Sequence, residues 1–154
     1  MHAPWRGLRC MKGTEPKSLT KGFGPSRKIT AMDIRPLLLV AAGGAIGAIL
    51  RYQITLTLPM ESHWATMGIN LLGALLLGIL AGGLHGGGVI SDDLLLFFGT
   101  GLLGAFTTMS TFSLDLATLF DADRFGTIGI HLVATGVLGP ALALAGWKLT
   151  AIVL

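Results

Sequence analysis

The sequence predicts an all-α membrane protein with four transmembrane helices, and three features of its composition carry that prediction. The chain has 154 residues, of which 52% are hydrophobic and only 12% charged. Its mean hydropathy is +0.73. Soluble domains carry about 25% charged residues, so this chain has too few to cover a water-facing surface. The composition therefore argues against a soluble globular enzyme and against an intrinsically disordered chain.

Four apolar stretches divide most of the chain, and each has a length of at least about 20 residues, enough for a helix to cross a ~30 Å hydrocarbon core. They contain few charges: Arg51 in the first, none in the second, Asp115 in the third and Lys148 late in the fourth. The remaining charges gather in the short linkers between the stretches. The predicted helices span residues 36–58, 64–84, 94–120 and 125–154.

The glycine content is a second indication of a membrane protein, since the chain has 23 glycine residues. The pairs Gly43/Gly47 and Gly78/Gly82 have the spacing of small residues that let two membrane helices approach closely. Glycine is also common in membrane helices generally. We interpret the high density here as close helix packing.

A cluster of hydroxyl side chains interrupts the third predicted helix. Residues 107–113 read TTMSTFS, with five Ser or Thr residues directly after Gly104, Ala105 and Phe106. Such a cluster at mid-span favours a broken helix, because non-helical backbone at membrane depth is tolerated only against protein or water. A broken helix frees carbonyls that bind cations and amides that favour anions. The alternative is ordinary hydrogen bonding of Ser and Thr to the preceding helical turn.

Other polar residues inside the spans are functional candidates, because buried polar groups in lipid are costly unless paired. Asn70 is the only asparagine, and it either donates to an anion or hydrogen-bonds between helices. Arg51 lies near the end of its span, as a vestibule charge or a snorkelling anchor. Asp115 is expected to cap or pair locally. His131 shares a helix face with Thr135, where a lone histidine is more often a satisfied packing residue than a ligand.

The first 32 residues differ from the rest of the chain. Residues 1–30 hold seven cationic side chains against one acidic, a net charge of +6, while residues 31–154 carry −3. The segment is rich in polar residues and has no helical or strand period, so we predict a disordered basic extension over residues 1–32 and a membrane domain over 33–154. A lipid-binding arm is one interpretation. We favour an extension without function, or a natural start at Met32.

Cationic residues of the membrane domain are divided evenly between its two ends. Arg35 and Lys148 fall at one end, and Arg124 at the other, together with Arg51 if it snorkels that way. Two cations against two give the positive-inside rule almost nothing to act on. A chain without this bias can insert in both directions, which suggests an antiparallel, two-fold homodimer.

Several kinds of chemistry are missing from the sequence. It contains no GxxxxGK[ST] or HExxH motif and no convincing Ser/His/Asp set, so we predict no enzyme activity. Four histidines and the single cysteine, Cys10, have no metal-site spacing and cannot form a disulfide framework. The basic character belongs to the N-terminal extension, so we expect no nucleic-acid partner.

Three motifs in order resemble those of the CrcB/Fluc fluoride channels. Residues 43–52 read GGAIGAILRY, similar to the family's GGxxGAxxRY. Residues 66–73 read TMGINLLG, similar to TxxxNxxG, and residues 99–112 read GTGLLGAFTTMSTF, similar to GxxGGxTTFSTF. The resemblance covers about residues 33–154, and the last motif is the most specific.

This resemblance implies a dual-topology homodimer with two fluoride pathways in a bacterial-type cell (inner) membrane. Asn70 would be the pore asparagine and Phe112 one of two pore phenylalanines. The hydroxyl groups on or near the pathway would be those of Ser110, Thr111, Ser113 and Thr135, and Arg51 would lie along it. Backbone carbonyls of Gly104 and Thr107 from both subunits would hold a structural sodium ion. Met109 departs from the family pattern, because it stands where the first pore phenylalanine is usual.

The implied function is physically coherent. Fluoride is small and strongly hydrated, so a pore must replace its water with close hydrogen-bond donors. Amide and hydroxyl groups supply such donors, and a phenyl ring has a positive edge. Two other functions stay open: a small dual-topology multidrug transporter, and a membrane assembly subunit that transports nothing. The transporter would need a carboxylate in its first helix, and residues 36–58 contain none.

Overall fold

The computed structural model describes residues 33–85 and 90–153, and every regular element in these ranges is a helix. The elements in chain order are α1 (Ile34–Thr57), α2 (Ser62–His85), α3 (Asp92–Leu94), the π-helix η1 (Leu95–Leu103), α4 (Gly104–Phe106), α5 (Met109–Asp121), α6 (Phe125–Val133), the π-helix η2 (Ala134–Leu138) and α7 (Gly139–Val153). The predicted basic extension at residues 1–32 lies outside the described residues.

These elements make four long apolar spans, as the sequence predicts. α1 and α2 are each one helix, whereas the third span joins α3, η1, α4 and α5, and the fourth joins α6, η2 and α7. The four spans have the length and apolar composition to cross a membrane. The first helix begins two residues before the expected position, because the Asp33 side chain accepts a hydrogen bond from Arg35 N at 3.2 Å and caps it.

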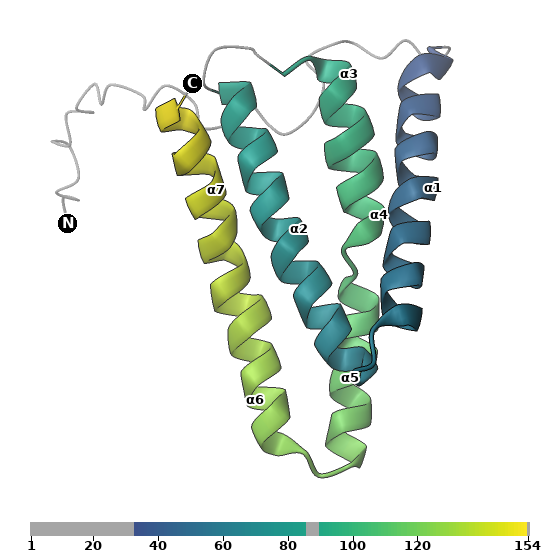
Figure 1. Ribbon diagram of the computed structural model, residues 1–154, viewed down its shortest axis with the longest axis vertical. Coiled ribbons are helices and arrows are strands. Elements are labelled where there is room, and N and C mark those ends of the chain that lie inside the picture. The colour runs from purple at the N-terminus through teal and green to yellow at the C-terminus, as the bar shows by residue number, and fades with distance from the viewer. Residues whose placement is uncertain (1–32, 86–89, 154) are drawn as a thin grey trace, which may run out of the picture.

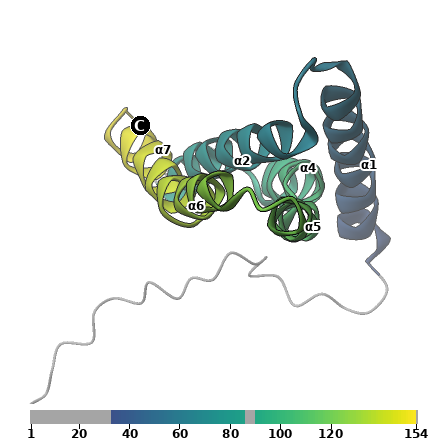
Figure 2. The ribbon, with the colours of Figure 1, turned by 90° about the horizontal axis from the view of Figure 1, so that it is seen from below.

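The spans are arranged as two close pairs rather than as a compact bundle. α1 packs along η1 and α4, and α2 packs along α7. Seen from below in Figure 2, α1 lies at one edge, α6 and α7 lie at the other, and α2, α4 and α5 lie between them. Large apolar side chains such as Leu37 and Val137 stay exposed along the outer faces. Exposed leucine and valine over this length suit a lipid environment.

Glycine makes both close pairs possible. A Cβ added to any of the four predicted glycines would overlap a backbone atom of the neighbouring helix. These glycines are Gly43, Gly47, Gly78 and Gly82. A Cβ on Gly47 would overlap the carbonyl of Leu102 in η1, and one on Gly78 would overlap the carbonyl of Ala143 in α7. The prediction of close helix packing is therefore confirmed, and the contact is backbone against backbone.

Ion pairs tie the helices at both ends of the molecule. Arg35 on α1 pairs with Asp93 on α3. At the opposite end (Figure 1), Arg124 Nη1 donates to both carboxylate oxygens of Glu61 at 2.8 and 3.0 Å. This hydrogen bond lowers the pKa of Glu61 below its ordinary value. One cation at each end is thus neutralised by a neighbouring carboxylate.

Candidate functional site

The third span is broken at Thr107 and Thr108, where the sequence predicts a break. α4 ends at Phe106 and α5 begins at Met109. Between them, Thr107 has φ −77° and ψ 152°, and Thr108 has φ −150° and ψ 114°, both extended. The narrow line of ribbon between α4 and α5 is visible in Figure 1. Extended backbone in the middle of an apolar span needs partners from other helices, because lipid supplies none.

Thr108 restarts the helix on the far side of the break. Its Oγ1 accepts a hydrogen bond from Thr111 N at 3.2 Å, which caps the N-terminus of α5. The same hydroxyl donates to Thr111 Oγ1 at 3.0 Å and lies 3.1 Å from Ser110 Oγ. Three of the predicted hydroxyl groups therefore bond to one another at the break.

Hydroxyl bonding to the preceding turn occurs as well, on both sides of the break. Thr107 Oγ1 donates to Leu103 O at 3.0 Å, and Ser113 Oγ donates to Met109 O at 2.9 Å. The two interpretations of the cluster are thus both correct for different residues. Thr107 and Ser113 bond to their own helices, and Thr108 lies where the helix is interrupted.

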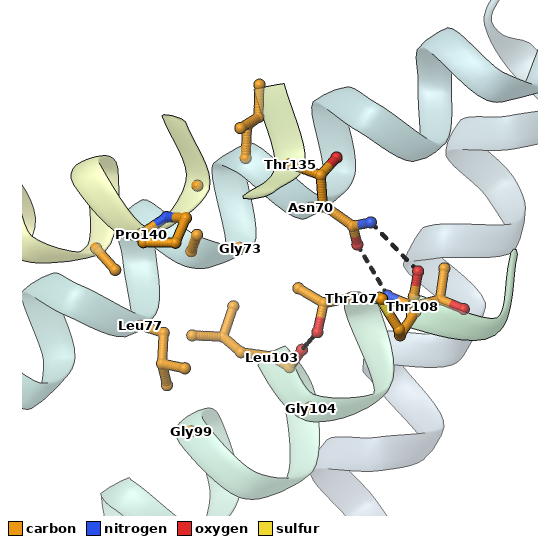
Figure 3. Close-up of a pocket in the computed structure, with 15 residues that line it drawn as sticks. Asn70, Gly73, Leu77, Gly99, Leu103, Gly104, Thr107, Thr108, Thr135 and Pro140 are labelled. Carbon is orange, nitrogen blue, oxygen red and sulfur yellow. Dashed lines mark hydrogen bonds between the residues drawn. The ribbon is translucent and has the colours of Figure 1, made fainter. Parts of the chain in front are cut away.

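Asn70 on α2 holds the break through both ends of its side-chain amide. Its Oδ1 accepts from Thr108 N at 2.9 Å, and its Nδ2 donates to Thr108 O at 3.2 Å (Figure 3). In a continuous helix, Thr108 N would instead bond to Gly104 O. The interhelical interpretation of Asn70 is therefore confirmed. The amide NH₂ carries two hydrogens, and the bond to Thr108 uses one of them.

Arg51 contacts the other side of the break from α1. Its Nε donates to Ala105 O at 3.3 Å, and the side chain is half-buried. In a continuous helix that carbonyl would accept from Met109 N, which the extended residues carry away. A cation at the C-terminal end of a helix also interacts favourably with the helix dipole. Arg51 is thus tied to the backbone next to the break.

A cavity of about 420 Å³ lies beside the break, between α2, the third span, η2 and α7. Its wall is mostly apolar and contains five of the predicted site residues: Asn70, Gly104, Thr107, Met109 and Thr135. Figure 3 shows Asn70, Thr107, Thr108 and Thr135 around it. The buried Thr135 Oγ1 has no hydrogen-bond partner among the described residues. The cavity therefore offers an unused hydroxyl close to the Asn70 amide.

The other predicted site residues do not line this cavity: Arg51, Ser110, Thr111, Phe112 and Ser113. Phe112 is 5% exposed and packs toward α6, whereas Met109 is 68% exposed and stands at the cavity. Within one chain, the sequence motif therefore divides between the cavity wall and the contact with α6.

A cluster of rings behind Phe112 has no clear signal in the sequence. The His131 ring is stacked on Phe112, with centroids 6.5 Å apart and planes at 25°. It also lies 5.2 Å from His63 and 5.3 Å from Trp64, both at the start of α2. These residues are too far apart in sequence for any periodicity to link them.

Two expectations about buried polar residues need refinement. His131 is a packing residue, fully buried among rings, but neither of its ring nitrogens has a hydrogen-bond partner among the described residues. Asp115 is 8% exposed, and within the part of the chain that the structure describes its Oδ2 has no partner. The fold brings polar groups together here without pairing them.

Four apolar spans, a third span broken at mid-length and a cavity at the break define a multi-pass membrane protein of the transport class, in which discontinuous helices form the site. Residues 38–147 match the family described as CrcB-like protein, Camphor Resistance (CrcB). The chain belongs to this CrcB/FluC family.

Relatives are similar to the chain over most of their own length. A protein of Halobacterium salinarum named Fluoride-specific ion channel FluC 1 is 40% identical over 118 residues, which is 75% of this chain and 94% of the relative. One of Phenylobacterium zucineum, named Fluoride-specific ion channel FluC, is 38% identical over 118 residues, 73% of this chain and 93% of the relative. A protein of Bacillus thuringiensis named Fluoride-specific ion channel FluC 2 is 42% identical over 116 residues, which is 73% of this chain and 94% of the relative.

Proposed function

We propose that this protein is a fluoride-specific ion channel of the cell membrane that lets fluoride leave the cytoplasm passively, and that it is not an enzyme. The relatives named as fluoride-specific channels support this function. The structural observation that carries it is Asn70, whose amide holds the broken helix at the wall of the cavity. This arrangement fixes a hydrogen-bond donor at mid-membrane without using all of its hydrogens.

The donors around the break suit a small hydrated anion. The second amide hydrogen of Asn70 and the unpaired hydroxyl of Thr135 can replace part of the water shell of fluoride. Ser110, Thr111 and Ser113 extend the hydroxyl groups along α5. Phe112 would present its positive ring edge to the ion. Met109 takes the place of the other usual ring, and its soft thioether makes the wall adaptable.

The working unit in this proposal is an antiparallel homodimer. The even division of cations between the two ends supports insertion in both directions. Gly104 and Met109 are exposed in the protomer although they lie beside the break, and a Cβ on Gly104 would meet little but open space. A second copy packed there would cover the cavity and bring the two breaks close to each other.

A structural sodium ion fits the backbone at the break. Among residues 33–85 and 90–153, no group of three or more His, Cys, Asp or Glu side chains could hold a metal ion. Since Thr108 N bonds to Asn70, the carbonyl of Gly104 loses its helical donor. The carbonyls of Gly104 and Thr107, contributed by both subunits, would hold the ion, which supplies positive charge at the dimer interface.

Fluoride efflux from loaded liposomes tests the function, with a fluoride-selective electrode as the readout. We expect Asn70→Asp and Phe112→Ile each to lower efflux at least tenfold, because the first replaces a donor by a carboxylate and the second removes the ring edge. Gln53→Glu and Phe120→Ile are the matched controls, since both side chains are exposed and outside the site. Undiminished efflux in both site variants, or proton-coupled uptake of an organic cation instead, would contradict the proposal.

Replacement of sodium tests the ion site. With potassium or an organic cation in place of sodium during purification, the dimer should dissociate more readily in size-exclusion chromatography and efflux should fall. Gly104→Pro would distort the carbonyl, so it should mimic sodium removal. A dimer and an efflux rate that are both indifferent to sodium would count against the site.

A further inference from the structure

His131 is the most deeply buried titratable side chain among the described residues, and none of the proposed roles above uses it. Its exposed fraction is 0%, and both ring nitrogens lack hydrogen-bond partners in the described part of the chain. Its ring lies between two sets of rings: His63 and Trp64 from α2 on one side, and Phe112 from α5 on the other.

We propose that His131 is a positioning residue for Phe112, whose ring direction it fixes by packing beside the phenyl ring. The inference rests on the proposed function for its flux readout. It concerns a residue on α6 that does not line the cavity.

The stack determines which part of Phe112 meets its surroundings. A phenyl ring has a negative face and a positive edge. The His131 ring lies beside Phe112 in an offset stack, with centroids 6.5 Å apart and planes at 25°, so the phenyl ring is kept from turning and its edge keeps one direction. His63 and Trp64 hold the imidazole from behind at 5.2 and 5.3 Å. Loss of the imidazole would leave a void in which Phe112 can rotate, and the ring edge would lose its fixed direction.

Charged and titratable groups face His131 from the two neighbouring helices. His63 on α2 and Asp115 on α5 both interact with it electrostatically. Glu61 lies behind His63, with Oε2 3.1 Å from Nε2. One turn further along the fourth span, in η2, Thr135 Oγ1 also has no hydrogen-bond partner among the described residues. Since none of these groups hydrogen-bonds to the imidazole in the described part of the chain, the surrounding rings hold it in place.

Two substitutions separate the positioning role from a general loss of packing. His131→Phe keeps a ring beside Phe112, and His131→Ala removes the ring. We expect His131→Phe to keep efflux within about twofold of the wild type, and His131→Ala to lower it about tenfold, after subtraction of the leak through protein-free vesicles. His63→Phe should also keep efflux near the wild-type rate, because the ring beside Phe112 remains.

An NMR experiment tests the contact without any flux. In protein labelled at histidine, the His131 ring signals should shift on Phe112→Ile and stay in place on Phe120→Ile, a ring on the same helix that contacts Phe125. Wild-type efflux by His131→Ala, an equal loss of efflux in His131→Phe and His131→Ala, or unmoved His131 signals in Phe112→Ile would each overturn the inference. Absence of fluoride efflux in the wild type would instead overturn the proposed function, and the NMR result would still decide whether His131 positions Phe112.

Discussion

The two halves of the third span are held in different ways. Before the break, η1 and α4 lie against α1 so closely that glycine is required at the contact, and backbone atoms meet directly. After the break, α5 is held by side chains, through the Thr108 cap and the stacking of Phe112 on His131.

The first half of the third span thus supports the fold, and the second half carries the functional groups. Backbone contact fixes the position of the first half but presents no functional group beyond the carbonyls at its end. Side-chain contact leaves the second half dependent on a few polar and aromatic residues, which also face the proposed pathway. Substitutions in the first half should therefore act on folding, and those in the second on passage.

The largest expected effect is on the first half. Gly47→Leu would force a side chain into the Leu102 backbone, which cannot move away by rotating a side chain. Overpacking typically costs about 1–3 kcal/mol, and backbone overlap places this variant at or above that range. We expect little folded protein in size-exclusion chromatography. Gly129→Leu is the control, because nothing lies within 4 Å of its added Cβ, and equal yields for the two variants would contradict the comparison.

Asn70→Leu should have the next largest effect, at the junction of the two halves. It removes both hydrogen bonds to Thr108 and leaves a backbone N–H and C=O without partners, at about 1–3 kcal/mol for each unsatisfied group. Thermal unfolding in detergent measures the loss. Gln53→Leu removes an exposed amide from α1 and should change stability little. A stable Asn70→Leu protein would mean that Asn70 does not hold the break.

Thr108→Ala should cost less, because it removes only the cap of α5. Loss of an N-cap side chain typically costs about 1 kcal/mol. Hydrogen exchange should show the loss as faster exchange in the first turn of α5, with η1 unchanged. Thr100→Ala, an exposed threonine of η1, is the control. Faster exchange throughout both halves would show that they do not behave separately.

The smallest effect should come from the Glu61–Arg124 pair, because both side chains are partly exposed. The pKa of Glu61 is lowered in the folded protein, chiefly by the hydrogen bond from Arg124. The stability from this pair is therefore fully present above the unfolded pKa, near 4.5, and is lost as pH falls through the folded value. Glu61→Gln should flatten the fall in melting temperature between about pH 5 and pH 3, whereas Asp121→Asn should not.

Features that depend on local composition could be predicted from the sequence. The four spans follow from apolar length, the close pairs from glycine spacing, and the break from five hydroxyls after Gly104. The π-helices η1 and η2 could not be predicted, because a shift of one residue in hydrogen bonding leaves the apolar composition unchanged.

The contacts of Asn70 and His131 depend on which helices become neighbours. The sequence leaves two roles open for Asn70. The interhelical hydrogen bond becomes evident only from the position of Thr108 beside it. Among the described residues, the fold surrounds His131 with rings instead of hydrogen-bonding groups, and no sequence pattern links those rings to it.

The unequal lengths of the spans have a consequence for the thickness of the membrane around this protein. The first two spans have 24 and 23 residues, and the last two have 30 and 29. At about 1.5 Å per residue, the longer pair exceeds the shorter by about 9 Å, and Figure 1 shows the α5–α6 corner extending beyond the ends of α1 and α2. In the proposed antiparallel dimer, each leaflet would meet one projecting corner and one short side. Lipid would thin beside the short side, so water would reach deeper toward the break without any widening of the helices.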